Sequence, residues 1–181
     1  WLTYEAPDGG GVMVIDSVEI DEGMYPILID TRRVGIDTMG CGQWNGAPAT
    51  EGSYYSLTGD MTVAYCADGD TYAAKGVLDG TSAAPSGNWK RHANGELEKL
   101  PSFHQETCAP FEAIVYRTCA GGGYGDPCSR DPALVAKDVS RQWLSKERAE
   151  EIYKTIVKPA DNGIDYVVDE VGTAALRNGI G

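Results

Sequence analysis

A glycine-rich segment at residues 119–127 has the residue types and the spacing best suited to binding chemistry. Four of the five positions 121–125 are glycine, and Tyr124 is the fifth. Backbone amides in such a turn, followed by the start of a helix, can hold a carboxylate or a phosphate group. The segment lacks the lysine and the hydroxyl residue of a phosphate-binding loop, and Asp126 adds a negative charge beside the glycines. Because glycine-rich turns more often serve tight turning and close packing, the pattern alone favours a structural role.

Other reactive side chains are not spaced for metal binding or nucleophilic catalysis. His92 and His104 are the only histidines, and neither belongs to an H-x-x-x-H or C-x-x-C pattern. We therefore expect both to have surface or hydrogen-bonded structural roles, and we expect no metal site on this chain. The five cysteines are odd in number and irregularly spaced, which favours a reducing cytoplasm over a disulfide framework. Cys119 and Cys128 flank the glycine-rich segment, but no residue near them in the sequence supplies a base.

The chain is strongly acidic. Its 27 Asp and Glu residues against 15 Lys and Arg residues give a net charge of −12 over 181 residues. Such a field repels phosphate backbones and anionic lipids, so we expect no nucleic-acid partner and no membrane partner. The longest apolar runs have the length of strands, so no transmembrane helix and no signal peptide are expected.

The elements that must position these residues change in character along the chain. Short β-branched or aromatic runs, separated by Gly, Asp and Pro clusters, predict strands at residues 11–18, 25–32, 54–57, 61–66, 72–75 and 112–118. Residues 81–110 form a long, polar stretch, and we expect an extended loop or a hairpin tip there that carries the basic cluster 90–92.

The last third of the sequence is helical in pattern. Asp131 is placed to cap a helix that begins at Pro132, and a second helix starts at Ser145 with Glu147 in its first turn. The apolar face of this second helix is predicted to consist of Ala149, Ile152, Tyr153 and Ile156. The predicted fold class is therefore α+β, with a β-rich antiparallel sheet or sandwich followed by a C-terminal pair of helices. One domain is expected over residues 1–181, β-rich over 1–120 and formed by the glycine-rich segment and the helical tail over 121–181.

The glycine-rich segment GGGYGDP is followed by RDPALVAKDV and then by SKERAEEIY. These motifs, in this order, resemble the C-terminal part of the hydantoinase B / oxoprolinase family, which includes subunits of acetone and acetophenone carboxylases. Upstream, Met24-Tyr25-Pro26-Ile27 resembles a family strand, and residues 37–46 resemble a family loop in which Asn45 stands where an arginine is usual. The resemblance runs from about Tyr4 to Arg177 and covers only the last third or so of a typical member.

The resemblance implies a function that this chain performs together with others. In that family, ATP activates a carbonyl or bicarbonate oxygen by phosphorylation on a hydantoinase A-like subunit, and the hydantoinase B-like part carries out the second step. The chain would be a small cytoplasmic subunit that completes a larger hydantoinase B-like subunit. The substrate would be a cyclic amide or imide that is hydrolysed, or a ketone that is carboxylated.

The resemblance also assigns the cofactors and the candidate site. The family's metal-binding His and Asp residues lie in an N-terminal portion that this sequence lacks, so we expect no cofactor on this chain. ATP with Mg and a divalent metal are expected on partner subunits. The sequence identifies no catalytic residue. The residues expected to line the site are Asp37, Thr38, Gly40, Gly42, Trp44, Asn45, Gly121, Gly122, Gly123, Tyr124, Gly125 and Asp126.

A second hypothesis is a non-catalytic subunit that stabilises a larger partner chain and touches no substrate. The loss of the family arginine at Asn45 favours this hypothesis, because it suggests that less is required of residues 37–46, which we call the upstream loop. The intact glycine-rich segment favours a place near the site, although a segment needed for folding would also be intact.

Overall fold

The structure is a computed structural model that describes residues 17–179. These residues form two compact units. The first unit comprises residues 17–33, 50–72 and 86–118, and the second comprises residues 34–49, 73–85 and 119–179. No helix in the described part of the chain is both long enough and apolar enough to cross a membrane.

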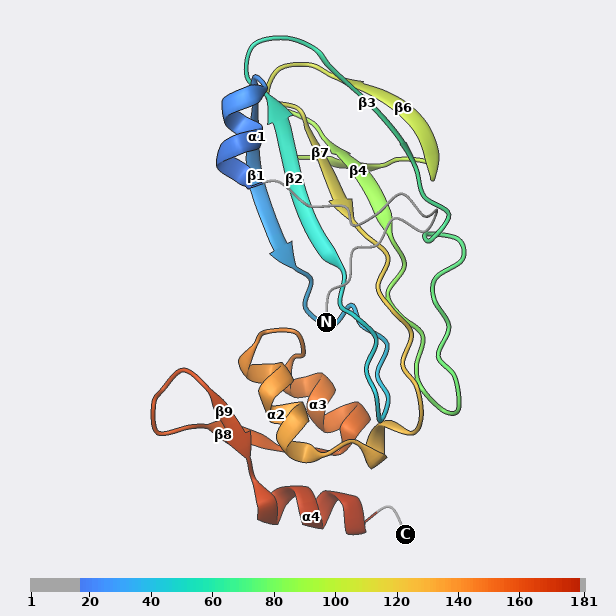
Figure 1. Ribbon diagram of the computed structural model, residues 1–181, viewed down its shortest axis with the longest axis vertical. Helices are drawn as coiled ribbons and strands as arrows, with labels where there is room; N and C mark the ends of the chain where they lie inside the picture. Colours follow the sequence, from blue (N-terminus) through green and yellow to red (C-terminus); the bar gives the residue numbers. More distant parts are fainter. Residues whose placement is uncertain (1–16, 180–181) are drawn as a thin grey trace. The chain divides into compact units, whose positions relative to one another are not determined.

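The first unit is built from antiparallel strands (Figure 1). The larger sheet has the order β1-β2-β7-β4-β5, with bounds Ile27–Val34, Thr50–Ser56, Ala113–Arg117, Gly87–Arg91 and Leu97–Lys99. A second sheet pairs β3 (Met61–Cys66) with β6 (Phe103–Cys108). Helix α1 (Val18–Met24) precedes β1, and the Ser17 hydroxyl caps it by accepting from the Ile20 N–H at 3.3 Å.

The core of the first unit lies between these two sheets. Burial alternates along β3 and β6, as expected for strands with one covered face. The buried residues Leu100, Cys108 and Ile114 form the centre of this core. Four half-buried side chains pack around them: Tyr54, Met61, Val63 and Tyr65.

The structure corrects three strand and loop predictions. The segment predicted as an extended loop or hairpin tip, residues 81–110, contains β4 and β5, which pair as a hairpin, and also β6. The polar side chains of this segment do not form a strand pattern, because partners elsewhere in the fold hold them in place. Lys90 of β4, for example, forms a 3.0 Å ion pair with Glu106 of β6. Residues 72–75 were predicted as a strand but form no strand. Of the strand predicted at 11–18, residues 11–16 lie outside the described residues; Ser17 caps helix α1 and Val18 begins it.

Local capping chemistry sets the helices of the second unit. The Asp131 carboxylate accepts from the Ala133 N–H at 2.9 Å and begins α2 (Pro132–Ser140), as predicted. The Ser145 hydroxyl accepts from the Arg148 N–H at 3.2 Å and begins α3 (Lys146–Tyr153), also as predicted. Helix α3 ends before Ile156, because Lys154 adopts a left-handed φ of 51°.

Elements that the sequence pattern did not indicate complete the second unit. A short helical turn, η1 (Pro127–Ser129), precedes α2. After α3 come a hairpin of β8 (Val157–Pro159) and β9 (Tyr166–Val168) and a last helix, α4 (Glu170–Asn178). The α+β fold class, with antiparallel sheets followed by C-terminal helices, is confirmed.

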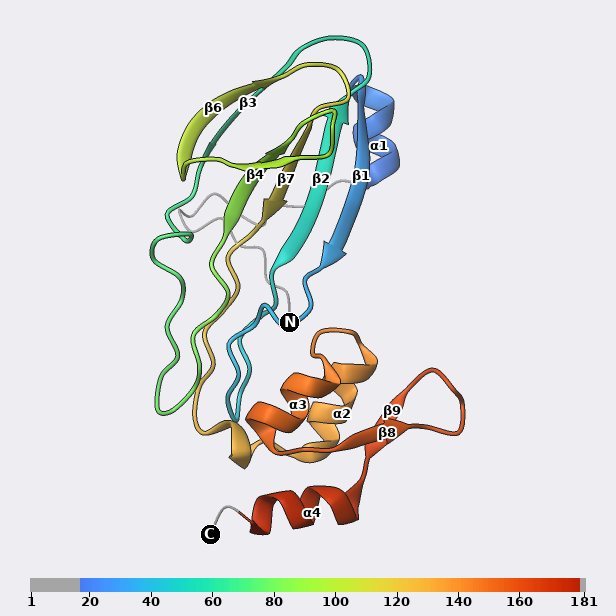
Figure 2. The ribbon, with the colours of Figure 1, turned by 180° about the vertical axis from the view of Figure 1, so that it is seen from behind.

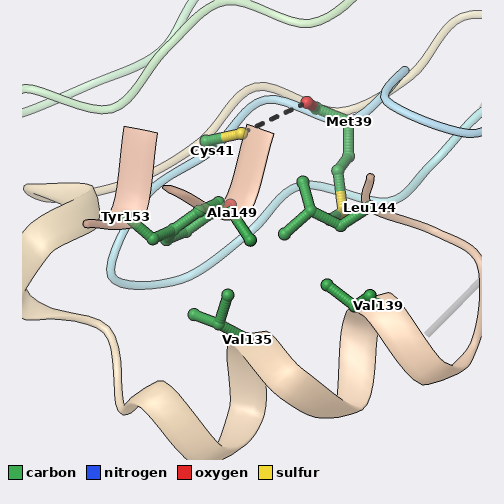
Figure 3. Packing of buried hydrophobic residues seen from close by; sticks show 7 residues of the cluster. All are labelled: Met39, Cys41, Val135, Val139, Leu144, Ala149 and Tyr153. Carbon is green, nitrogen blue, oxygen red and sulfur yellow. Dashed lines mark hydrogen bonds between the residues drawn. The ribbon is translucent and has the colours of Figure 1, made fainter. Parts of the chain in front are cut away.

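The core of the second unit joins a loop to the helices (Figure 3). Met39 and Cys41 come from the upstream loop, and their side chains meet those of the helical tail. The helical tail contributes the buried residues Val135, Val139, Leu144, Ala149 and Tyr153. The upstream loop, which precedes β2, is therefore part of this core and does not lie on the surface at Met39 and Cys41.

Candidate functional site

Three extended segments of the second unit pack backbone to backbone, and we call residues 37–49, 73–85 and 119–126 together the loop junction (Figure 2). The Gly40 N–H donates to the Gly121 carbonyl at 2.9 Å, and the Gly46 N–H donates to the Gly40 carbonyl at 3.0 Å. The Val77 N–H donates to the Gly123 carbonyl at 3.0 Å. Because the three segments are far apart in sequence, these bonds bring the two predicted site loops together.

The glycine-rich segment is used for close packing. A Cβ atom on Gly123 would collide with the Cys41 carbonyl, and one on Gly122 would collide with the Lys75 carbonyl. The backbone therefore lies where no side chain fits.

Backbone amides of this segment already have acceptors within the chain. The N–H groups of Gly121, Gly123, Tyr124 and Gly125 donate to the carbonyls of Ala47, Thr81, Trp44 and Val77, at 2.8 to 3.0 Å. Asp126 caps η1 by accepting from the Cys128 N–H at 2.9 Å. An anion held by these amides would have to displace those bonds, so the geometry favours the packing role for the segment.

Trp44, Tyr124 and Val77 form an apolar row across the loop junction. Trp44 and Tyr124 exchange two backbone hydrogen bonds, of 3.0 and 2.9 Å, and Val77 pairs with Tyr124 through a parallel bridge. Residues directly opposite each other on paired segments point to the same side. Although their backbones are fixed, the side chains are 61%, 50% and 55% exposed, respectively. We call these three residues the aromatic row.

A tight turn beside the aromatic row holds an unfavourable backbone conformation. Leu78 and Asp79 have φ values of 49° and 71° within the turn closed by the Gly80 N–H on the Val77 carbonyl at 3.1 Å. Leucine is disfavoured at a positive φ, which costs about 1 to 2 kcal/mol. Its side chain is nevertheless exposed, so burial does not offset this cost within the described chain.

Asp37 and Thr38 hold the upstream loop in place. The Asp37 carboxylate accepts from the Ser145 N–H at 2.8 Å, just before α3. The Thr38 hydroxyl donates to the Gly35 carbonyl at 2.8 Å and accepts from the Ala49 N–H at 2.9 Å. Thr38 is buried, so its role in this chain is to tie the two ends of the loop together.

Asn45 sits at the centre of a buried polar cluster. Its side-chain oxygen accepts from the Tyr153 hydroxyl at 2.7 Å and from the Gly42 N–H at 3.2 Å. Its side-chain nitrogen donates to the Asp138 carboxylate at 3.1 Å. Arg130 completes the cluster with a 2.9 Å ion pair to Asp138 and a 3.0 Å hydrogen bond to the Gln43 carbonyl.

Burial dominates the ionisation of this cluster. It raises the pKa of Asp138, although the charge and the hydrogen bonds of Arg130 act in the opposite direction. Burial, with Cys41 as a second cause, also raises the pKa of Tyr153, so the phenol stays protonated and remains a donor to Asn45. The cluster is thus a structural link between the upstream loop and helices α2 and α3.

Sequence reasoning assigned no role to Arg130, Asp138 or Tyr153 in this cluster. One signal was available, because Asp138 lies between Val135 and Val139 on the face of α2 that the apolar pattern marks as buried. A carboxylate at such a position requires a buried partner. Among the residues that the structure describes, no three His, Cys, Asp or Glu side chains come together in a way that would hold a metal ion.

Comparison with known proteins identifies the family. The hydantoinase B/oxoprolinase family model matches residues 9–127. Caprolactamase subunit beta of Pseudomonas jessenii is 29% identical over 171 residues, which cover 92% of this chain and 29% of that protein. The chain therefore belongs to the hydantoinase B/oxoprolinase family.

Two solved structures share the fold. Nucleotide-free acetone carboxylase matches with a TM-score of 0.76 at 21% identity, over 91% of this chain and 26% of that one. ATP-dependent caprolactamase from Pseudomonas jessenii matches with a TM-score of 0.69 at 24% identity, over 90% of this chain and 28% of that one. The chain spans less than a third of the length of these relatives, which fits the predicted C-terminal part of the family.

Proposed function

We propose that this chain is part of a multi-subunit, ATP-dependent enzyme, in which it completes a hydantoinase B-like subunit. Its partners would be the rest of that subunit and a hydantoinase A-like subunit. The substrate would be a cyclic amide or imide for hydrolysis, or a ketone for carboxylation. The names of the relatives support this proposal, since they are an ATP-dependent caprolactamase and an acetone carboxylase. A cytoplasmic location is part of the proposal.

The observation that carries the proposal is the aromatic row on the loop junction. Trp44, Tyr124 and Val77 project from a backbone held by hydrogen bonds, yet all three are half exposed or more. A rigid apolar surface of this kind suits the wall of a small-molecule site. In this account the chain shapes the site, while ATP, Mg and a divalent metal are bound by its partners.

The chemistry assigned to the whole enzyme has two steps. Phosphorylation of a carbonyl or bicarbonate oxygen makes that oxygen a good leaving group, and water or a carbon nucleophile then completes the reaction. The aromatic row contains no carboxylate, imidazole or amine side chain. Its contribution would be to exclude water and to orient the substrate.

The alternative is an assembly subunit without substrate contact. The bonds of Asp37, Thr38 and Asn45 favour it, because all three predicted site residues are engaged inside the chain. In that case the aromatic row would be covered by a partner chain, and it would bind no substrate.

Activity of the complete enzyme tests the proposal. The complex purified from its source would be assayed for ATP hydrolysis with a hydantoin, with a lactam, and with a ketone plus bicarbonate. We expect one of these substrates to stimulate ATP hydrolysis and to be converted in step with it. A complex that contains this chain and responds to none of them would contradict the proposal.

A further inference from the structure

The larger sheet of the first unit has one face that β3 and β6 do not cover. Ile114 of β7 points into the core beneath those two strands. Its neighbour Val115 therefore points to the opposite face, because side chains alternate along a strand. In the register of the sheet, Val115 lies between Ser53 of β2 and Trp89 of β4. These positions define the second face of the sheet, which β3 and β6 leave uncovered.

A groove of about 410 Å³ lies on this face. Its volume falls within the range typical of small-molecule sites, roughly 300 to 1,000 Å³. Six residues matter for its chemistry: Arg33, Arg91, Arg117, Trp89, Leu97 and Val115.

Arginine is concentrated in this groove. Three arginines line it, with Glu51 in the lining paired to Arg33 and Asp30 beside the lining paired to Arg91, although acidic residues outnumber basic ones in the whole chain. The arginines come from three different strands, β1, β4 and β7, so the arrangement does not arise from one basic run of sequence. The fold gathers these positive charges.

The guanidinium groups of Arg33 and Arg91 are held in place but retain N–H donors for an anion. Arg33 donates through Nε and Nη2 to Glu51 at 3.1 and 3.0 Å, and Arg91 donates through Nη2 to Asp30 at 2.9 Å. A guanidinium has five N–H donors in a planar fork, so one carboxylate does not exhaust it. Such forks bind carboxylates and phosphates in the bidentate mode.

The rest of the groove is apolar. The ring of Trp89 has the Arg117 guanidinium over it at 5.7 Å, and Leu97 and Val115 add aliphatic surface. A ligand that fills this space would combine an anionic group with a flat apolar body.

We propose that this groove is a second binding site, which takes a small molecule with a carboxylate or phosphate group on an aromatic or similar apolar body. The site belongs to the first unit and does not depend on the function proposed for the loop junction. Arg33 and Arg91 would bind the anionic group, and Trp89 with Leu97 would contact the apolar body.

Calorimetric titration of the full chain with four probes tests this site: phenyl phosphate, benzoate, inorganic phosphate and benzyl alcohol. We expect phenyl phosphate or benzoate to bind at least fivefold more tightly than inorganic phosphate, and benzyl alcohol to show no binding. The better of the first two probes identifies the preferred anionic group. If inorganic phosphate binds as tightly as phenyl phosphate, or if no probe binds, the proposal is wrong.

Matched variants assign the binding to the groove. Arg91→Gln should weaken the binding of the preferred probe at least fivefold, whereas Lys158→Gln should leave it unchanged. Lys158 is an exposed residue of β8 in the second unit, so its replacement changes the net charge equally. Equal weakening by both variants would indicate a general charge effect and would overturn the proposal.

A second variant keeps the test valid if Arg91→Gln does not fold. Arg91 bonds Asp30, which also accepts from Ser53, so Arg91→Gln can disturb the sheet. Arg33→Gln changes a side chain that is 69% exposed, and it should weaken binding without altering the circular dichroism spectrum. Unchanged affinity in a folded Arg33→Gln variant, with Arg91→Gln unfolded, would contradict the site.

Discussion

Asn45 and Tyr153 lie 108 residues apart in the sequence and meet through a 2.7 Å hydrogen bond from the tyrosine hydroxyl to the asparagine side-chain oxygen. Asn45 belongs to the upstream loop, and Tyr153 is the last residue of α3 and fully buried. The same asparagine reaches Asp138 of α2 at 3.1 Å. One small side chain thus joins the loop that carries Trp44 to helices α2 and α3.

Replacing Asn45 should destabilise the fold. Asn45→Ala removes the acceptor for Tyr153 and a donor to Asp138, and both remain buried, so we expect a loss of about 1 to 3 kcal/mol in the free energy of unfolding. Tyr153→Phe removes only one hydrogen bond and should cost about 1 kcal/mol. Urea denaturation of the full chain measures both. If Asn45→Ala costs no more than Tyr153→Phe, the polar cluster is not the link that we describe.

A side chain at Gly123 should disrupt the loop junction. Gly123→Val would place Cβ against the Cys41 carbonyl, and because the obstacle is backbone, we expect a loss of about 3 kcal/mol or more. Gly23→Ala is the matched control, since Cβ at Gly23 meets nothing within 4 Å and alanine favours the helix by about 0.5 to 1 kcal/mol. Thermal unfolding followed by circular dichroism compares the two. A stable, folded Gly123→Val chain would contradict the packing role.

An ionic network in the first unit should make stability depend on pH. The hydrogen bond from the Ala109 N–H, and to a smaller extent the one from Lys90, lower the pKa of Glu112 from 4.5 to about 2. The contribution of Glu112 to folding stability is therefore present above pH 4.5 and is lost as the pH falls toward 2. Hydrogen bonds to Glu112, the larger cause, and to Glu98 raise the pKa of His92 above 6.5. The contribution of His92 to folding stability is complete below pH 6.5 and is lost as the pH rises through the folded-state pKa. We expect the network to stabilise the chain most between about pH 4.5 and 6.5.

The variant Glu112→Gln tests this network. It removes the carboxylate that Lys90 and His92 share, at 3.0 and 3.2 Å. The difference in unfolding free energy between the wild-type chain and the variant should be largest within the window of pH 4.5 to 6.5. It should shrink on both sides of that window. A difference that stays constant from pH 3 to pH 8 would show that the network does not act through ionisation.

Replacing residues of the aromatic row should lower the turnover of the assembled enzyme more than the stability of the isolated chain. Because Trp44 and Tyr124 are half exposed or more, the double variant Trp44→Ala, Tyr124→Ala should change the unfolding free energy of the chain by no more than about 1 kcal/mol. In the assembled enzyme we expect turnover to fall at least tenfold. Phe103→Ala, which removes an exposed aromatic residue of the first unit, should leave turnover unchanged.

Two results of that experiment separate the functional hypotheses. Loss of turnover in an intact complex would support the wall of a substrate site. Dissociation of the complex would support a row that is covered by a partner chain. Full activity of the double variant in an intact complex would contradict both.

Local signals predicted the helices well and the strands in part. Asp131 and Ser145 cap their helices through bonds within three residues, so the sequence around them suffices. Strands β4 and β5 could not be predicted in this way, because their polar residues are held in the sheet by pairing with β7 and with each other. The single domain predicted for residues 1–181 stays a prediction.

The candidate site was predicted as two loops, and the structure brings those loops together. Trp44 and Tyr124 were both predicted to line the site, but their direct pairing depends on bonds between segments about 80 residues apart. The partners in the cluster around Asn45 are also distant in sequence, and the buried position of Asp138 was the one signal of it in the sequence. Whether any of these residues touches a substrate stays a prediction.

Native mass spectrometry of the complex purified gently from its source, with peptide identification of every chain, tests the central claim most directly. We predict a stoichiometric assembly in which this chain accompanies a hydantoinase A-like chain and the rest of a hydantoinase B-like subunit. This chain found by itself, as a stable and monodisperse monomer, would contradict the claim.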